Sequence, residues 1–307
     1  MFNYINIPYS DKINKLLVFH GNSSKLKDYL EVSRGSIVKW KEDDSAINND
    51  NKLKIDVAYC EAFGFTEITT NDIDKMYDEL SKIDFSYFNT NEDILVQQIS
   101  KISAFGSLEI EEDNITEKMF NKVVESKELI KNLNQRELFS IKNLASLNDK
   151  VINDTIKDNL QDIDTRAIKQ WHYNLMTGIR SDAGEYSTNH RIIPNSQEII
   201  LTDPRDISEE LERWTTKYTN VKTLRDIAMA HSHFELIHPF GDGNGRIGRM
   251  IIAIHSIKAG YIPPMINKSN KALYYVFLKD SQITSEYGYL SYFIGQSILS
   301  MHNKFFR

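Results

Sequence analysis

Several features are scarce or missing in this sequence, and each shortage excludes a class of protein. Cys60 is the single cysteine in 307 residues, so no disulfide can form within the chain and we expect a buried, reduced thiol. No run of eighteen apolar residues occurs, so no membrane-spanning helix is expected. The first residues lack a basic start followed by an apolar run, so we expect no signal peptide. These absences predict a cytoplasmic protein that does not enter a membrane.

Positive charge is also in short supply. The formal net charge is −6, so general attraction to nucleic acid is not expected, and any phosphate-binding site has to be local. The composition is 41% hydrophobic and 26% charged, which is typical of a globular protein with room for two domains. We divide the chain into residues 1–90 and 91–307, because helical periodicity becomes clear from about residue 91. For the first part three roles stay open: contact with targets, self-association into a homo-oligomer, and packing on the core.

Helical spacing of apolar residues dominates the second part of the chain. The fold class that we expect is therefore mainly α: a helical bundle with one β-hairpin, preceded by a small α or α+β region. The hairpin is predicted at 191–204, where two short β-rich runs flank residues 195–197. In the first part, 72–83 predicts a helix, 16–22 a strand or a short helix, and 41–52 a polar loop. Helices are expected at 91–105, 117–133, 135–152, 164–178, 207–218, 223–237, 246–260, 272–280 and 287–306.

The stretch HPFGDGNGRIGR, residues 238–249, concentrates groups that bind anions. Its glycines allow successive backbone N–H groups to converge, and the helix that follows adds the unpaired donors of its first turn. Arg246 and Arg249 are three residues apart, so they project from one helix face, and each can hold a phosphate through a fork of donors. Two arginines beside such a loop favour a polyphosphate as the ligand.

The same stretch supplies a base and a metal ligand. Asp242 is a hard oxygen ligand of the kind that Mg²⁺ prefers when phosphates supply its other ligands. His238 ends the preceding helix and is a candidate general base near neutral pH. Together with the anion-binding groups, these residues predict a nucleotide-transfer site.

The twelve residues also match every fixed position of the Fic signature, His-x-Phe-x-(Asp/Glu)-Gly-Asn-Gly-Arg-x-x-Arg. MTGIRSDAGEYS (176–187), GYIPP (260–264) and YLSYFIGQSI (289–298) resemble the family as well, so the likeness extends over residues 91–307. The resemblance implies a Fic-type helical bundle that acts as a protein adenylyltransferase. Such an enzyme moves AMP from ATP, with Mg²⁺, to a Tyr, Thr or Ser hydroxyl of a target protein. Gly245 stands where the related Doc-type kinases carry lysine, which favours AMP transfer over transfer of the terminal phosphate.

The resemblance also assigns roles to individual residues. His238 would deprotonate the target hydroxyl, Asp242 would bind Mg²⁺, and Phe240 would anchor the loop in the core. The nucleotide would contact Gly243, Asn244 and Gly245 at its α-phosphate, Arg246 and Arg249 at its outer phosphates, and, by a looser match, Asn270 and Tyr274 at its adenine. A flap would dock the target by strand addition through Ile192, Ile193, Ile199 and Ile200.

An upstream segment, SLEIEE at 107–112, resembles the inhibitory motif of many Fic proteins, (Ser/Thr)-x-x-x-Glu-(Gly/Asn). Ser107 takes its first position and Glu111 the glutamate, and the helix that carries it is expected at about 92–112. Glu112 departs from the motif, and the alternative register with Glu109 as the key residue is poorer. A carboxylate paired with Arg249 would occupy the cation needed by the outer phosphate. A plain solvated acidic face is the alternative interpretation.

These residues also allow other interpretations. GNGRIG at 243–248 fits a dinucleotide fingerprint, but the preceding residues have helical spacing and 264–272 holds no acid. A metal hydrolase would use His231 and His233 with the loop, yet residues two apart on a helix point to nearly opposite faces. His172 is expected to be an ordinary structural histidine. For the Fic interpretation itself, an enzyme that removes AMP or does both, and a non-catalytic nucleotide-binding interaction module, are the alternatives.

Overall fold

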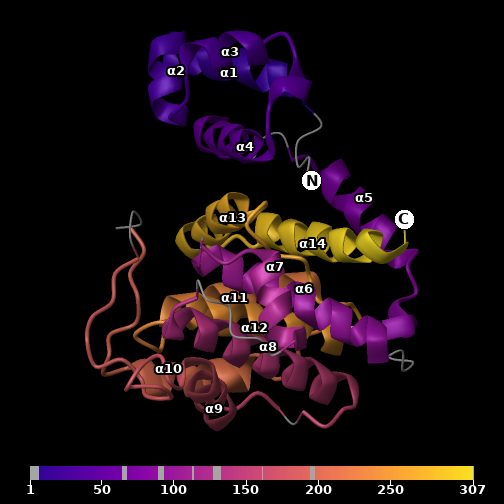
Figure 1. Cartoon of the computed structure of the whole chain (residues 1–307), viewed down its shortest axis with the longest axis vertical. Coiled ribbons are helices and arrows are strands. Elements are labelled where there is room, and N and C mark those ends of the chain that lie inside the picture. The colour runs from indigo at the N-terminus through magenta and orange to yellow at the C-terminus, as the bar shows by residue number, and fades with distance from the viewer. Residues whose placement is uncertain are drawn as a thin grey trace.

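The computed structural model describes residues 7–63, 68–88, 93–112, 114–126, 133–160, 162–193 and 198–306. Within these ranges the chain is mainly helical and no strand is assigned, which confirms the predicted mainly α class. Figure 1 shows a small N-terminal group of helices standing above a larger bundle. None of the helices in the described part of the chain is long and apolar enough to cross a membrane.

The N-terminal region is helical throughout its described residues. Its elements are α1 (Tyr9–His20), α2 (Ser23–Leu30), α3 (Arg34–Trp40), the 3₁₀ turn η1 (Asp44–Ala46), α4 (Asn49–Phe63), α5 (Thr70–Ser81) and η2 (Phe85–Phe88). The strand alternative for 16–22 is wrong, because 16–20 belong to α1 and the next two residues join it to α2. The predicted helix at 72–83 is confirmed as α5, which begins with a capping box between Thr69 and Asp72.

The polar stretch at 41–52 is not a simple loop, because it contains η1 and the start of α4. Its charge has a structural use: the Asp44 carboxylate accepts hydrogen bonds from the backbone nitrogens of Tyr9 (2.9 Å) and Ser10 (2.7 Å), at the first turn of α1. Lys12 is fully buried and pairs with Asp56 of α4 at 2.6 Å. Sequence pattern alone could not show these partners, which lie more than thirty residues away.

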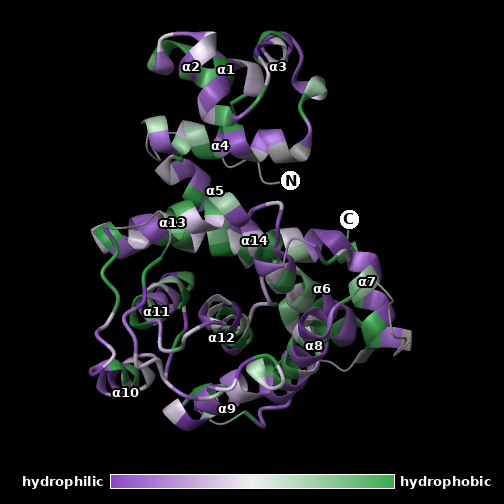
Figure 2. Cartoon of the chain, turned by 60° about the vertical axis from the view of Figure 1, so that its left-hand side comes forward, coloured by the Kyte–Doolittle hydropathy of each residue, from purple (hydrophilic) through white to green (hydrophobic). Residues whose placement is uncertain are grey.

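The larger bundle surrounds two central helices, α11 (Leu224–Ile237) and α12 (Asn244–Lys258), which Figure 2 shows almost end-on. A helix that is apolar on all sides is expected in a core, and α12 is buried along nearly its whole length. Around this pair lie α6 (Asp93–Glu111), α7 (Glu117–Asn121), the π turn η3 (Lys122–Ser126), α8 (Gln135–Ile156), α9 (Thr165–Met176), α10 (Ile207–Lys217), α13 (Lys271–Thr284) and α14 (Gly288–Phe306). The loop 238–243 is thus held at both ends by buried helices.

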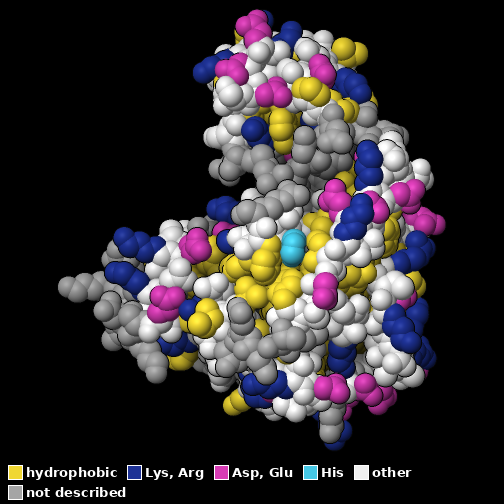
Figure 3. All heavy atoms as spheres, turned by 90° about the vertical axis from the view of Figure 1, so that its right-hand side faces the viewer, with side chains coloured by type: hydrophobic (Ala, Val, Ile, Leu, Met, Phe, Trp, Pro, Cys, Tyr) yellow, Lys and Arg dark blue, Asp and Glu magenta, His cyan; other side chains and the backbone are white. Residues whose placement is uncertain are grey.

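The N-terminal helices adjoin the bundle through α4 on α13 and α5 on α14. On the face shown in Figure 3, apolar side chains gather below the N-terminal part, near the C-terminal end of the chain. Aromatic contacts join η2 to this region: the Tyr87 ring lies 4.6 Å from that of Phe306, and the Phe85 ring 5.8 Å from that of Tyr261. The two parts of the chain therefore share apolar contacts.

The segment predicted as a hairpin runs outward and returns, as Figure 1 shows at the left, but without a strand ladder in its described residues. The predicted turn at 195–197 lies outside the described residues. Two strands without a third partner are marginal in water, and Ile192 and Ile200 are 81% and 87% exposed. The base of the segment is held differently: the Arg191 guanidinium donates to the Thr202 carbonyl, and the Thr202 nitrogen donates to the carbonyl of Leu236 on α11 (3.1 Å).

Candidate functional site

A cavity of about 480 Å³ opens beside the loop between α11 and α12. The loop forms its floor, the end of α6 and one face of α13 form walls, and Ile192, Ile193 and Ile199 form a rim. Its lining includes His238, residues 241–245 and Arg249 from the predicted motif. The cavity is within the size range of small-molecule sites, and its polar groups converge at one end.

Two left-handed residues shape the loop. His238 ends α11 at φ +48°, with its backbone nitrogen donating to the Phe234 carbonyl at 2.9 Å. Gly243 precedes α12 at φ +81°, and a Cβ placed there would lie 3.2 Å from the Met176 sulfur. Glycine is therefore required at 243 both for its backbone angle and for space. The sharp turn brings His238 back over the first turn of α12.

The Asn244 side chain ties the loop together. Its Oδ1 accepts from the Phe240 nitrogen (2.9 Å) and its Nδ2 donates to the Phe240 carbonyl (2.7 Å). Both ends of the amide are thus used within the protein, and the side chain is buried. Contact with the α-phosphate, the role predicted for Asn244, would therefore fall to its backbone N–H. Its side chain sets the shape of the loop.

His172 supports the loop from α9, which sequence reasoning missed. Its ring stacks on Phe240 with centroids 3.7 Å apart and planes at 4°. The Gly184 nitrogen donates to Nδ1 at 2.9 Å, so the ring proton is on Nε2, which donates to the Asp242 carbonyl at 3.0 Å. Burial lowers the pKa of His172 to about 4, so the ring is neutral. No local pattern points to it, because Asp242 is seventy residues away in sequence.

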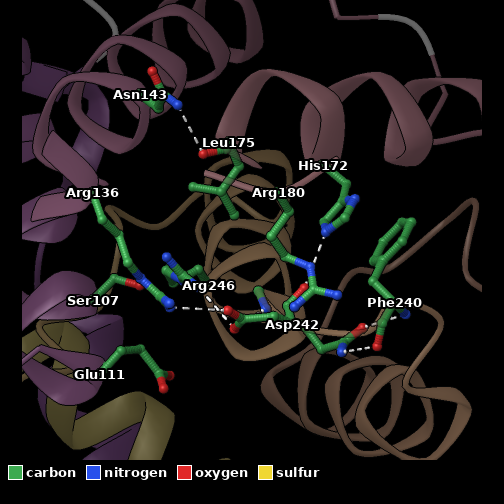
Figure 4. Close-up of polar contacts among 12 residues, drawn as sticks. Ser107, Glu111, Arg136, Asn143, His172, Leu175, Arg180, Phe240, Asp242 and Arg246 are labelled. Atoms are coloured by element: carbon green, nitrogen blue, oxygen red, sulfur yellow. Dashed lines mark hydrogen bonds and ion pairs between the residues drawn. The ribbon is translucent and has the colours of Figure 1, made fainter. Parts of the chain in front are cut away.

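The Asp242 carboxylate lies between two arginines, as Figure 4 shows. Its Oδ1 accepts from the Gly243 nitrogen (2.6 Å) and from Arg246 (3.0 Å), and its Oδ2 lies 3.4 Å from Arg136 of α8. The carboxylate remains one third exposed. Arg246, predicted to hold a phosphate, is buried and engages Asp242 in this structure.

The first turn of α12 offers free donors to an anion. Gly243 provides no capping side chain, so the leading N–H groups of the helix are open to a ligand. A Cβ on Gly245 would lie 2.9 Å from Arg249 and 3.1 Å from the Glu111 carboxylate. Glycine at 245 thus lets an acidic group approach the backbone closely, and Glu111 is the group that does so here.

Glu111 ends α6 and reaches across the cavity to Arg249. The Arg249 guanidinium donates to the Glu111 Oε1 (2.8 Å), the Ser107 Oγ (3.0 Å) and the Ser107 carbonyl (3.0 Å). Burial alone would raise the pKa of Glu111, but Arg249 and Arg246 more than offset this effect and lower it. Glu111 is therefore an ionised carboxylate at neutral pH.

The positions of Glu109 and Glu112 show which register of the upstream segment brings a carboxylate to Arg249. Glu109 turns away, and its Oε1 accepts from the Lys268 nitrogen at 3.1 Å. Glu112, the departure from the motif, follows the helix end and does not displace Glu111. Glu111 is thus the glutamate of this segment that contacts Arg249, and its inhibitory role stays a prediction.

His238 and Glu235 face the cavity from the end of α11. Burial, followed by the charge of Arg191, lowers the pKa of His238 to about 4, so its imidazole is neutral at pH 7 and can accept a proton. Burial raises the pKa of Glu235 to about 7. The sequence analysis passed over Glu235, although its spacing of three from His238 on one helix was a usable signal.

The far end of the cavity is built by one face of α13. Tyr274 lines it, but its hydroxyl is hydrogen-bonded to His231 Nε2 at 2.7 Å. Asn270 lies outside the lining of this cavity, and its amide bonds to the backbone of Met265 and Asn267, so its contact with adenine stays a prediction. Helical spacing on α13 could have identified the lining residues that were missed, which are Tyr275, Leu278, Lys279 and Gln282.

The predicted flap residues divide into two groups. Ile192, Ile193 and Ile199 contribute to the cavity rim. Ile200 is outside the lining and is almost fully exposed. The Glu198 carboxylate pairs with Lys279 of α13 at 2.6 Å, which links the returning arm to the wall of the cavity.

The histidines do not form a metal centre with the loop. His231 bonds to Tyr274, and His233 Nε2 to the Tyr287 hydroxyl at 2.8 Å. Within the described ranges, no three His, Cys, Asp or Glu side chains converge as metal ligands would. Asp242 offers a carboxylate of the loop itself beside the anion-binding turn, which suits a cation that arrives with most of its ligands supplied by phosphates.

Comparison with known proteins finds a likeness to Fic proteins. A model of the Fic/DOC family matches residues 162–255. The protein adenylyltransferase Fic of Drosophila erecta is 31% identical over 137 residues, which is 42% of this chain and 27% of that protein. The corresponding Drosophila melanogaster protein is 31% identical over 125 residues, 38% of this chain and 25% of that protein. The chain thus spans about a quarter of the length of these curated relatives.

Solved structures agree on the fold. A segment of Fic-1 from Caenorhabditis elegans matches with a TM-score of 0.60 at 15% identity, covering 95% of this chain and 87% of that one. A Fic domain containing signaling protein from Bacteroides thetaiotaomicron matches with a TM-score of 0.58 at 16% identity, covering 76% and 91%. At these identities the likeness concerns the fold.

Proposed function

We propose that the protein transfers AMP from ATP to a Tyr, Thr or Ser hydroxyl of a target protein, in keeping with the match of residues 162–255 to the Fic/DOC family model. The observation that carries this proposal is the cavity itself. It holds a neutral histidine, an uncapped helix N-terminus and Arg249 at one end. These are the groups that phosphoryl chemistry on a nucleotide requires.

His238 is the base in this mechanism. Its neutral imidazole takes the proton of the target hydroxyl, and the hydroxyl oxygen bonds to the α-phosphorus of ATP. The bond from that phosphorus to the bridging oxygen breaks, and pyrophosphate leaves. The backbone N–H groups of Asn244 and Gly245 donate to the α-phosphate oxygens, where negative charge develops, and Gly243, whose N–H donates to Asp242, gives the turn its shape.

The cations of the loop hold the remaining phosphates. Arg249 is fixed by Ser107 and is ready to bind an outer phosphate once Glu111 withdraws. Arg246 lies beside Asp242, and both face the same end of the cavity. Asp242 would hold Mg²⁺ together with the phosphates; when bound, the ion would neutralise their charge and fix their positions.

Glu111 acts as an inhibitor in this proposal. Its carboxylate occupies the space in front of Gly245 and neutralises Arg249. ATP could then bind only with its outer phosphate displaced from the position needed for transfer.

The buried thiol of Cys60, whose pKa burial raises to about 12, fits a reducing compartment, and we place the reaction in the cytoplasm.

Labelled ATP tests the proposal. The Glu111→Gly protein is incubated with lysate, Mg²⁺ and ATP labelled at either the α- or the γ-phosphate. We expect protein-bound label from α-labelled ATP only, absent in a Glu111→Gly, His238→Ala double variant and retained when exposed His190 is changed to alanine instead. Label from the γ-position would indicate a kinase. ATP binding without any transferred label would indicate the non-catalytic module.

A further inference from the structure

Glu235 is a buried carboxyl group to which the mechanism above assigns no task. It is 5% exposed, lies three residues before His238 on the last turn of α11, and borders the same cavity. Room has been made for it: a Cβ on Gly248 of α12 would lie 2.1 Å from its Oε1. An alanine at 248 would therefore collide with the carboxyl group.

An ionisable atom of the proposed base lies close to this carboxyl group. The Nδ1 of His238 is 3.7 Å from the Oε2 of Glu235. Nδ1 is buried and has no partner within hydrogen-bond distance, although the backbone of Glu235 lies close enough to raise the pKa of His238. The 3.7 Å separation is just beyond a hydrogen bond, so a small rotation of either side chain would close the contact between Nδ1 and the carboxylate. Since Nδ1 is buried while His238 lines the cavity, Nε2 is the nitrogen that faces a substrate.

We propose that Glu235 is a positioning residue for His238, whose carboxylate accepts the Nδ1–H hydrogen bond and so keeps Nε2 free to take the proton of the target hydroxyl. The inference rests on the proposed function. When that proton arrives, His238 becomes a cation, and the Glu235 carboxylate stabilises it in a site with little water. Glu235 itself neither gains nor loses a proton in this step.

The charges around Glu235 make its ionisation sensitive to pH. Burial raises its pKa to about 7, opposed by Arg249 of α12 and reinforced by Glu111 of α6. Further titratable or charged groups face this pair from α11, α13 and the rim segment: His231, Tyr274, Tyr275 and Arg191. The carboxylate form increases as pH rises through about 7, so the rate of transfer should rise over the same interval.

The test removes the charge of Glu235 and keeps the shape of its side chain. Protein labelled with ¹⁵N-histidine is compared as wild type and Glu235→Gln by imidazole NMR, with His238→Ala used to assign the signals. We expect the Nδ1–H form of His238 to dominate in wild type at pH 8. In the glutamine variant, the population of this form and the pKa of His238 should both fall. Glu109→Gln, on the far side of α6, should leave the His238 signals unchanged.

Kinetics supply the second readout. We expect Glu235→Gln to lower kcat by about 10- to 100-fold, with an unchanged KM for ATP and with loss of the rise near pH 7. Glu235→Asp, which restores the charge at a shorter reach, should recover part of the rate. A lower kcat in Glu235→Gln with an unaltered pH profile would contradict the inference.

The two readouts separate the inference from the proposed function. If the glutamine substitution leaves the tautomer and the pKa of His238 as in wild type, the positioning role is wrong whatever the activity. If the NMR signals shift as expected and no variant transfers AMP, the contact stands and the proposed function fails. Thermal unfolding of the variants identifies any that do not fold, and Glu235→Asp then provides the NMR comparison.

Discussion

Replacing Glu111 with glutamine removes one negative charge from the cavity and leaves its shape almost unchanged. In the structure the Glu111 carboxylate is 2.8 Å from Arg249, whose side chain is 3% exposed, while that of Glu111 is 36% exposed. A hydrogen bond to a charged group contributes about 1.5–3 kcal/mol. Partial exposure of the carboxylate reduces this to about 1–2 kcal/mol. If ATP has to displace Glu111 from Arg249, its binding is weakened by that amount.

The corresponding change in affinity can be measured directly. Because about 1.4 kcal/mol is a factor of ten in an equilibrium constant, Glu111→Gln should tighten binding of a non-hydrolysable ATP analogue with Mg²⁺ by about 5- to 30-fold. Isothermal titration calorimetry measures this, and transfer of label from ATP should increase in parallel. Glu109→Gln removes the same charge two residues away, where the carboxylate contacts Lys268, and serves as the matched control.

The outcome shows whether Glu111 competes with ATP for Arg249. An equal dissociation constant for wild type and Glu111→Gln, with both proteins folded, would mean that the nucleotide does not need Arg249 or that Glu111 leaves it without cost. A similar gain in Glu109→Gln would reduce the effect to general charge repulsion. Either result would refute the inhibitory role assigned to Glu111.

Three further substitutions test the loop and its surroundings. Asn244→Ala removes both bonds to the Phe240 backbone and should destabilise the protein by about 2–4 kcal/mol, seen in urea unfolding. Asp242→Asn should abolish the difference between ATP binding with and without Mg²⁺ in calorimetry. For Glu235→Gln the effect depends on pH. Burial raises the Glu235 pKa from 4.5 to about 7, so the folded protein binds this proton more tightly and wild-type stability declines as pH rises between those values. The glutamine variant should gain up to about 3 kcal/mol over wild type between pH 4 and pH 8.

Local sequence information was sufficient for the helices and for the motif. Apolar spacing predicted α8, α9, α11 and α12, because each packs one continuous face or is buried all round. The role of the loop glycines was predicted from the backbone conformations that glycine permits, and Gly243 does adopt a left-handed φ. Periodicity failed at 191–204, where the described residues, 191–193 and 198–204, form no strand. Propensity predicts pairing there, but pairing also needs a neighbouring strand, and the described part of the chain provides none.

The supports of the loop that sequence reasoning missed act across elements. His172 reaches the loop from α9, and Arg136 reaches Asp242 from α8, over separations of 70 and 106 residues. Asn270, which matched a pocket position loosely, bonds to its own turn. A motif specifies residue types along one segment, whereas the support of that segment depends on which helices the topology brings beside it.

The same reasoning applies to the division of the chain at residue 90, which stays a prediction. The change in periodicity there is real, yet α5 packs on α14 so closely that a Cβ on Gly295 would lie 2.2 Å from the Met76 sulfur. In addition, α4 packs on α13, the helix whose other face forms the cavity wall. Removing residues 1–88 would uncover apolar surface on α13 and α14, so the N-terminal helices stabilise the part of the bundle that holds the nucleotide end of the site.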